Sequence, residues 1–181
     1  MRHAQRIRPF QQGHLDSFCG AYCIVNAAHL VCGPLTRPRA MALLREIVAF
    51  LDRRASLVER INWGLTLQDV GGVMRHVLDV RYPIRRCKPF RGHPSVGLDE
   101  YWGTIRQFVE QRGGVVVTAF GGRLEHWTVI RDVTRHRLLL FDSSGRGQVT
   151  RRCCVMASDP PDRRHYILHP THTYFLWVDP R

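Results

Sequence analysis

The sequence predicts an α+β domain in which an N-terminal helical part packs on a C-terminal antiparallel sheet. Segments with helical periodicity dominate residues 18–112, and apolar or alternating strand-like runs follow them. The chain of 181 residues contains no internal repeat and no low-complexity linker. Because that length suits one compact core, we expect a single domain over residues 1–181.

The first expected helix covers residues 18–32, which are apolar nearly all round and stop before Gly33 and Pro34. That pattern is typical of a buried helix. Thr66 followed three residues later by Asp69 resembles a capping box and marks another helix start. Further helices are therefore expected over residues 38–55, 66–79 and 98–112.

Strands are expected where the helical period disappears. The runs "GVVVTAF", "HWTVIRDV", "RHRLLLFDSS" and "THTYFLWVD" combine β-branched, aromatic and alternating residues. A short strand is also expected within residues 80–88, and residues 156–171 are interpreted as the longest loop.

The formal net charge is +12, and Lys88 is the only lysine. This charge favours an acidic partner, so we expect a peptide or protein substrate with a preference for acidic ones. The arginines are scattered along the chain and no known nucleic-acid-binding motif occurs. A solvated basic surface explains them better, although nucleic acid is not excluded.

Hydropathy and cysteine content indicate the compartment. No apolar run approaches the roughly 20 residues of a membrane helix, so no membrane insertion is expected. The basic N-terminus is not followed by an apolar core. We therefore expect a cytoplasmic protein, or one exported without a cleaved signal peptide, with reduced thiols that include a core residue at Cys23.

Three residues in chain order predict cysteine chemistry. Cys19 opens the first helix, His126 starts one strand, and Asp142 ends the next. Adjacent antiparallel strands would place His126 beside Asp142. A helix N-terminus and an imidazolium both favour the thiolate, and a carboxylate orients the ring.

An acyl-transfer site also needs hydrogen-bond donors for an oxyanion. The Cys19 amide can supply one, and Gly20 leaves room for a substrate carbonyl. A side-chain amide can supply the second, and both Gln11 and Gln12 lie in the preceding loop. Asp16 is an alternative neighbour of the site.

The segments "QGHLDSFCGAYCIVNA", "EHWTVIRDV" and "LLLFDSSG" resemble the papain-like cysteine peptidase superfamily. Two branches are most similar: the peptidase domains of bacteriocin-exporting ABC transporters with their free-standing relatives, and the Josephin deubiquitinases. The Josephin pattern matches at Cys19, Cys23, Asn26 and the Glu125-His126-Trp127 run. One departure is that Gln12 precedes Cys19 by seven positions rather than five or six.

The resemblance implies a papain-like fold and a thiol hydrolase that cleaves an amide or isopeptide bond through a thioester. It implies Cys19 as nucleophile, His126 as general base and acid, Asp142 as orienting carboxylate and Gln12 as oxyanion donor. It implies no metal and no cofactor. Two alternatives stay open: a glutamine deamidase, transglutaminase or other acyltransferase, as found among bacterial effectors, or a non-catalytic module that binds peptide or nucleic acid.

Overall fold

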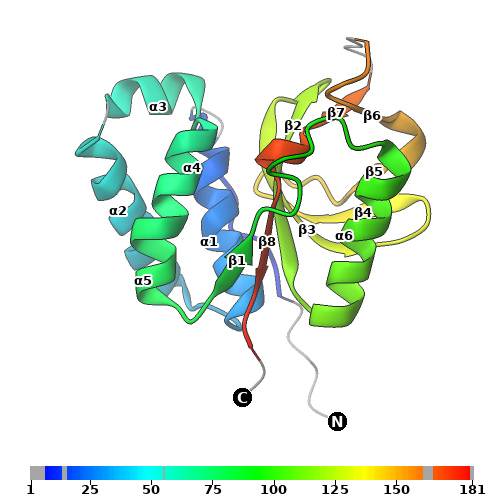
Figure 1. Cartoon of the computed structure of the whole chain (residues 1–181). Coiled ribbons are helices and arrows are strands. Elements are labelled where there is room, and N and C mark those ends of the chain that lie inside the picture. Colours follow the sequence, from blue (N-terminus) through cyan, green and yellow to red (C-terminus); the bar gives the residue numbers. More distant parts are fainter. Residues whose placement is uncertain (1–6, 14–15, 55, 161–164, 180–181) are drawn as a thin grey trace.

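The computed structural model describes residues 7–13, 16–54, 56–160 and 165–179. Residues 1–6 of the basic N-terminal segment lie outside this range. The fold combines helices with a mainly antiparallel sheet, as the α+β prediction requires (Figure 1). The helices are α1 (Cys19–Val31), α2 (Arg37–Asp52), α3 (Leu57–Trp63), α4 (Leu67–Val73), the π-helical turn η1 (Met74–Leu78), α5 (Asp79–Arg81), α6 (Leu98–Arg112), and the 3-10 turns η2 (Arg151–Cys153) and η3 (Pro170–His172).

The strands form one sheet in the order β1-β8-β2-β3-β4-β5, and β7 joins β2 to β6. All pairs are antiparallel except β6 with β7. Their bounds are β1 (Arg85–Cys87), β2 (Val115–Gly122), β3 (His126–Val133), β4 (Arg137–Phe141), β5 (Gln148–Thr150), β6 (Cys154–Met156), β7 (Tyr166–Leu168) and β8 (Tyr174–Trp177).

Each face of the sheet supports a separate hydrophobic core because successive strand residues point to opposite faces. On β2, Val115 and Val117 pack with α1, α2 and α4, whereas Val116 and Phe120 pack with α6. Figure 1 shows the same division, with α1–α5 on one side of the sheet and α6 on the other. The helices α1–α5 therefore cover one face of the sheet, and α6 covers the second face.

The predicted helices and main strands are confirmed to within a few residues, and so is the capping box of Thr66 and Asp69. Several short elements were not predicted. They are α3, in which no residue is buried, the strands β5 and β6, and the 3-10 turns η2 and η3. The interpretation of residues 156–171 as a loop is wrong at β7, a three-residue strand held by pairing with β2 and β6.

Within the described part of the chain, no helix has both the length and the apolar character that crossing a membrane requires.

Candidate active site

Cys19 is the first residue of α1. A turn made by Asp16 precedes it, in which Phe18 N donates to Asp16 Oδ1 at 3.0 Å. Ser17 N donates to Ile61 O of α3 at 2.9 Å, which ties this turn to the helical layer. The first amides of a helix lack intrahelical partners and carry partial positive charge, so the Cys19 side chain lies where negative charge is stabilised.

His126 and Asp142 meet at one end of the β3–β4 pair. His126 begins β3, and Asp142 directly follows β4. The two strands are antiparallel, with Val129 opposite Phe141, so the start of one lies near the end of the other. His126 Nε2 is 2.7 Å from Asp142 Oδ2, and both side chains are buried. The structure thus brings together the imidazole and carboxylate that the sequence separates by sixteen positions.

The Cys19 side chain completes this group. It lines the same cavity as His126, and its nearness to the imidazole contributes to the raised pKa of His126. Asp142 is itself held in place by Ser144, whose backbone N donates to Asp142 Oδ1 at 2.8 Å and whose hydroxyl donates to the same oxygen. The thiol, imidazole and carboxylate are therefore gathered at one place in the fold.

The His126–Asp142 contact favours the charged forms of both groups. Burial alone lowers the pKa of His126, but the hydrogen bonds and negative charges of Asp142 and Cys19 outweigh burial and raise this pKa to about 9. Burial alone raises the pKa of Asp142, yet the hydrogen bond and charge of His126, with the hydrogen bonds from Ser144, lower it to about 2. An imidazolium beside a carboxylate is consequently favoured at neutral pH.

We expect the stability that this pair contributes to depend on pH. The pKa of His126 rises on folding from 6.5 to about 9, so its contribution is complete below the first value and lost as the pH rises to the second. The pKa of Asp142 falls from 3.8 to about 2, so its contribution is complete above the first value and lost as the pH falls to the second. The pair should therefore stabilise the fold most between pH 3.8 and pH 6.5, where both contributions are complete.

Urea unfolding of the wild type and of His126→Leu measures this effect. The wild type should be the more stable protein near about pH 5.5 by up to about 3 kcal/mol, and the margin should shrink by about pH 9.5. His136→Leu, in the exposed turn between β3 and β4, is the control and should show no such window. A His126 margin that stays constant from neutral to alkaline pH would contradict the favoured charged pair.

Cys23 lies one turn after Cys19 on the same helix but has a different environment. Its side chain is buried in the core between the helices and the sheet. Burial, and then the negative charges of Cys19 and Asp142, raise the pKa of the Cys23 thiol well above its ordinary value. Cys23 is thus a protonated core residue, as the sequence predicted.

The segment before α1 places the two candidate glutamines beside the end of β4. Gln12 Nε2 donates to Asp16 O at 3.3 Å, and Gln12 Oε1 accepts from Ser143 Oγ at 3.0 Å. Gln11 Nε2 instead donates to Asp142 O at 3.4 Å. Because an amide nitrogen carries two hydrogens, Gln12 retains one for another acceptor. The role of Gln12 as oxyanion donor stays a prediction.

Asn26 holds this segment in place. Phe10 N donates to Asn26 Oδ1 at 2.8 Å, and Asn26 Nδ2 donates to Phe10 O at 3.0 Å. A single buried side chain of α1 thereby satisfies both backbone groups of a residue next to the glutamines. Asn26 therefore bridges the helix and the neighbouring loop.

Gly20 has a packing role, and the room it leaves for a substrate carbonyl stays a prediction. Gly20 is buried, and a Cβ there would lie 3.0 Å from Leu65 Cβ and 3.3 Å from Trp127 Cδ1. Trp127 is fixed in turn, because its Nε1 donates to Leu65 O at 3.0 Å. The glycine therefore allows α1 to approach β3 and the segment after α3.

Cys19 and His126 line a cavity of about 270 Å³, which we call the Cys19 pocket. The pocket supplies room for a substrate beside the sulfur. Two parts of its walls, residues 63–65 and the histidines at 169 and 172, have no spacing in the sequence that marks them as part of the site. The other lining residues are Trp63, Gly64, Leu65, Ala119, Phe120, Gly121, Glu125, Trp127, His169 and His172.

Two of these residues are histidines on η3 and the residue before it. Burial lowers the pKa of both His169 and His172, which favours neutral rings at neutral pH. Trp63 differs from the rest of the wall because its side chain is 86% exposed at the end of α3. It places an aromatic surface beside the opening, where a substrate could contact it.

Comparisons of the chain with protein-family models, with curated proteins and with solved structures found no match. Among the described residues, no group of three or more His, Cys, Asp or Glu side chains is arranged to hold a metal ion. The chemistry of the site is therefore argued from its own geometry.

Proposed function

We propose that this chain is a papain-like thiol hydrolase that cleaves an amide bond in a peptide or protein. Cys19 is the nucleophile, His126 the general base and acid, and Asp142 the carboxylate that orients the ring. The observation that carries the proposal is the hydrogen-bonded His126–Asp142 pair with Cys19 close to the His126 ring, at the edge of a cavity. Such a chain of groups is the usual arrangement for an activated nucleophile.

The first half of the reaction forms a thioester. The proton that Cys19 gives up is held on His126, whose imidazolium is the favoured form, and the sulfur attacks the carbonyl carbon of the substrate. The oxyanion that develops is stabilised by the Cys19 amide at the start of α1, with Gln12 as the candidate second donor. When the carbon–nitrogen bond breaks, His126 gives its proton to the leaving amine.

The second half of the reaction uses water. His126, now neutral, takes a proton from a water molecule as the oxygen attacks the thioester carbon. The carbon–sulfur bond breaks, the carboxylic acid product leaves, and the sulfur is released beside the protonated His126, as at the start of the reaction. Asp142 keeps the ring in one orientation through both halves and stabilises its charged form.

Selective alkylation of Cys19 tests the activated thiol. The wild-type protein is treated with a limiting amount of iodoacetamide near neutral pH, and the labelled positions are read by mass spectrometry. We expect Cys19 to react ahead of Cys87, although Cys87 is exposed and Cys19 is only 8% exposed. An ordinary thiol with a pKa of about 8.5 is mostly protonated under these conditions. Labelling that simply follows exposure would contradict the proposal.

A matched cleavage assay tests the reaction. A library of peptides is incubated with the wild type and with Cys19→Ala, and new termini are identified by mass spectrometry. Cleavage by the wild type alone supports the proposal. Products that carry an added amine in place of water would instead indicate acyl transfer by the same three residues.

A further inference from the structure

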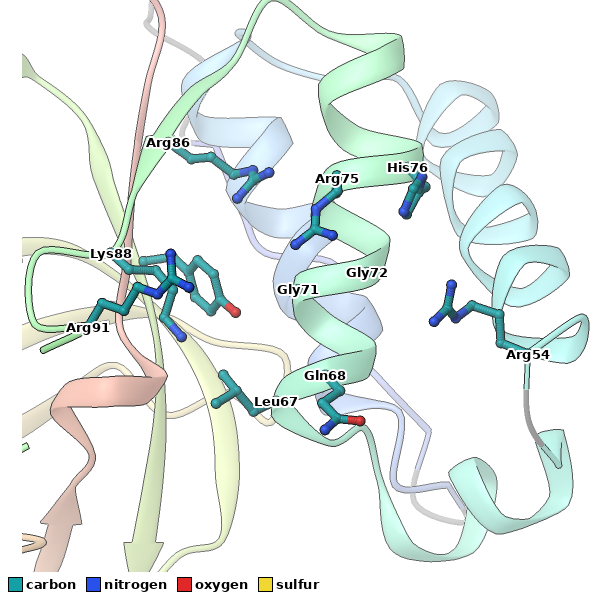
Figure 2. A pocket seen from close by; sticks show the side chains of 11 residues that line it. Arg54, Leu67, Gln68, Gly71, Gly72, Arg75, His76, Arg86, Lys88 and Arg91 are labelled. Atoms are coloured by element: carbon teal, nitrogen blue, oxygen red, sulfur yellow. The ribbon is translucent and has the colours of Figure 1, made fainter.

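A second and larger cavity, of about 680 Å³, lies between the helical layer and the sheet. Arg75 reaches into it from η1, and Arg86, Lys88 and Arg91 reach into it from β1 and the loop that follows (Figure 2). Tyr174 of β8 forms part of its wall. We call this cavity the basic cleft. Its described lining contains no Asp or Glu side chain.

Most of the positive charge in the basic cleft is not neutralised. Arg86 is paired, because its Nη2 lies 2.8 Å from Asp79 Oδ2. Within the described ranges, no carboxylate forms an ion pair with Arg75, Lys88 or Arg91. Burial, and then the charge of Arg91, lower the pKa of Lys88. The cleft therefore holds like charges whose repulsion an anion would relieve.

Several arginines outside the basic cleft are neutralised by ion pairs. Five of them form ion pairs with carboxylates on the protein itself, so their charge is used within the fold. These pairs are Arg60–Asp69, Arg81–Glu46, Arg85–Asp179, Arg106–Glu110 and Arg151–Asp99. What distinguishes the basic cleft is that Arg75, Lys88 and Arg91 gather at one cavity whose described lining holds no carboxylate.

Two chain segments border both the basic cleft and the Cys19 pocket. Leu65 lines the pocket and Leu67 the cleft; likewise His172 lines the pocket and Tyr174 the cleft. Residues two apart in sequence are separated by at most about 7 Å. The charge of Lys88 acts across this border, because it contributes to the lowered pKa of His172. Burial and the charge of His169 are the two larger causes of that shift.

We infer that the basic cleft binds acidic side chains of the substrate, close to the bond that is cleaved. This inference rests on the proposed function and names its substrate class: peptides with Asp or Glu near the scissile bond. An extended peptide advances about 3.3–3.6 Å per residue, so residues two to four positions from that bond can reach the cleft. Guanidinium groups suit carboxylates because they can donate two parallel hydrogen bonds.

The wall of the basic cleft favours peptide over nucleic acid. Grooves for single-stranded nucleic acid combine positive charge with open aromatic faces on which bases stack. Two ring side chains belong to the described lining, Tyr174 and His76. Tyr174 is only 3% exposed, and the Lys88 Nζ lies 4.8 Å from its ring centre. The exposed His76 ring stacks on Phe50, with 5.5 Å between the ring centres. The cleft therefore offers cations for carboxylates, while both of its rings already contact other side chains.

A binding measurement that needs no catalysis tests this inference. The Cys19→Ala protein is titrated against a fluorescein-labelled peptide of eight glutamates, and fluorescence polarisation reports binding. A peptide of eight glutamines and a thymidine oligonucleotide of eight nucleotides serve as comparison probes. We expect the glutamate peptide to bind and the glutamine peptide not to bind.

Charge-neutral variants locate the binding. The variant Arg75→Gln/Lys88→Gln/Arg91→Gln should bind the glutamate peptide at least about tenfold more weakly. The control Arg131→Gln/Arg135→Gln/Arg152→Gln removes the same charge from three exposed positions outside the cleft and should bind as before. Lys88→Arg keeps the charge and should retain binding. Thermal unfolding of every variant shows whether each is folded at the assay temperature.

The possible outcomes separate this inference from the proposed function. An equal loss in the cleft variant and the control, or tighter binding of the oligonucleotide at the cleft, overturns the inference. Peptide cleavage with no enrichment of Asp or Glu near the cut bond, together with no binding of the glutamate peptide, overturns it and leaves the hydrolase intact. Cleft-dependent binding without any cleavage by the wild type supports the acidic-peptide site and overturns the hydrolase.

Discussion

Replacing Cys19 with alanine should reduce peptide cleavage to the uncatalysed level, a loss of at least about a thousandfold. Cys23 on the same helix cannot take its place, because it is buried and its pKa is raised. The cleavage rate of a peptide found in the library, measured for both proteins at equal concentration, gives the effect. Removing one sulfur from a small, nearly buried side chain leaves the helix intact, so the variant should remain folded.

Cys23→Ala is the matched control for this substitution. It makes the same chemical change one turn further along α1, in the core instead of beside the Cys19 pocket. We expect it to lower the stability modestly while each folded molecule keeps its activity. If the two variants lost activity equally, or if Cys19→Ala kept most of the cleavage rate, Cys19 would not be the nucleophile.

Replacing His126 with alanine should have the second largest effect, a loss of about a hundredfold to ten-thousandfold in cleavage rate. The substitution removes the base for the thiol, the acid for the leaving amine and the positive charge beside the sulfur. Alkylation of Cys19 near neutral pH should slow as well, and the difference from the wild type should narrow at alkaline pH, where any accessible thiol ionises.

Asp142→Asn distinguishes orientation from proton transfer. It keeps the shape of the side chain that His126 contacts at 2.7 Å but removes its charge. The raised pKa of His126 depends on hydrogen bonds and charge from Asp142 and Cys19, so the variant should lower that pKa. An NMR titration of the ring measures the shift. A variant with unchanged activity and unchanged titration would show that the carboxylate does not orient the base.

The scattered arginines predicted a solvated basic surface but not the basic cleft. The prediction describes Arg85 and Arg106, which form exposed ion pairs. Arg75 and Arg91 belong to a different group, because the turn η1 and the loop after β1 bring them to one cavity. Charges sixteen residues apart show no periodic signal, so no pattern along the chain could have grouped them.

The amino-acid sequence by itself determined the features that depend on neighbours along the chain. These are the buried helix that Cys19 opens, the Thr66–Asp69 capping box, the helix over residues 98–112 and the strand that His126 begins. Each follows from local periodicity, a helix cap or a stop signal, whose physical causes act within one or two turns.

Only the tertiary structure decided how these features are combined. Strand pairing brings His126 to Asp142, α3 and the segment after it complete the Cys19 pocket, and α6 covers the second face of the sheet. The role of Gly20 as a packing residue also depends on Leu65 and Trp127, which are distant in sequence. These contacts arise from burial of apolar surface between remote segments, and that free energy has no signature at any one position in the chain.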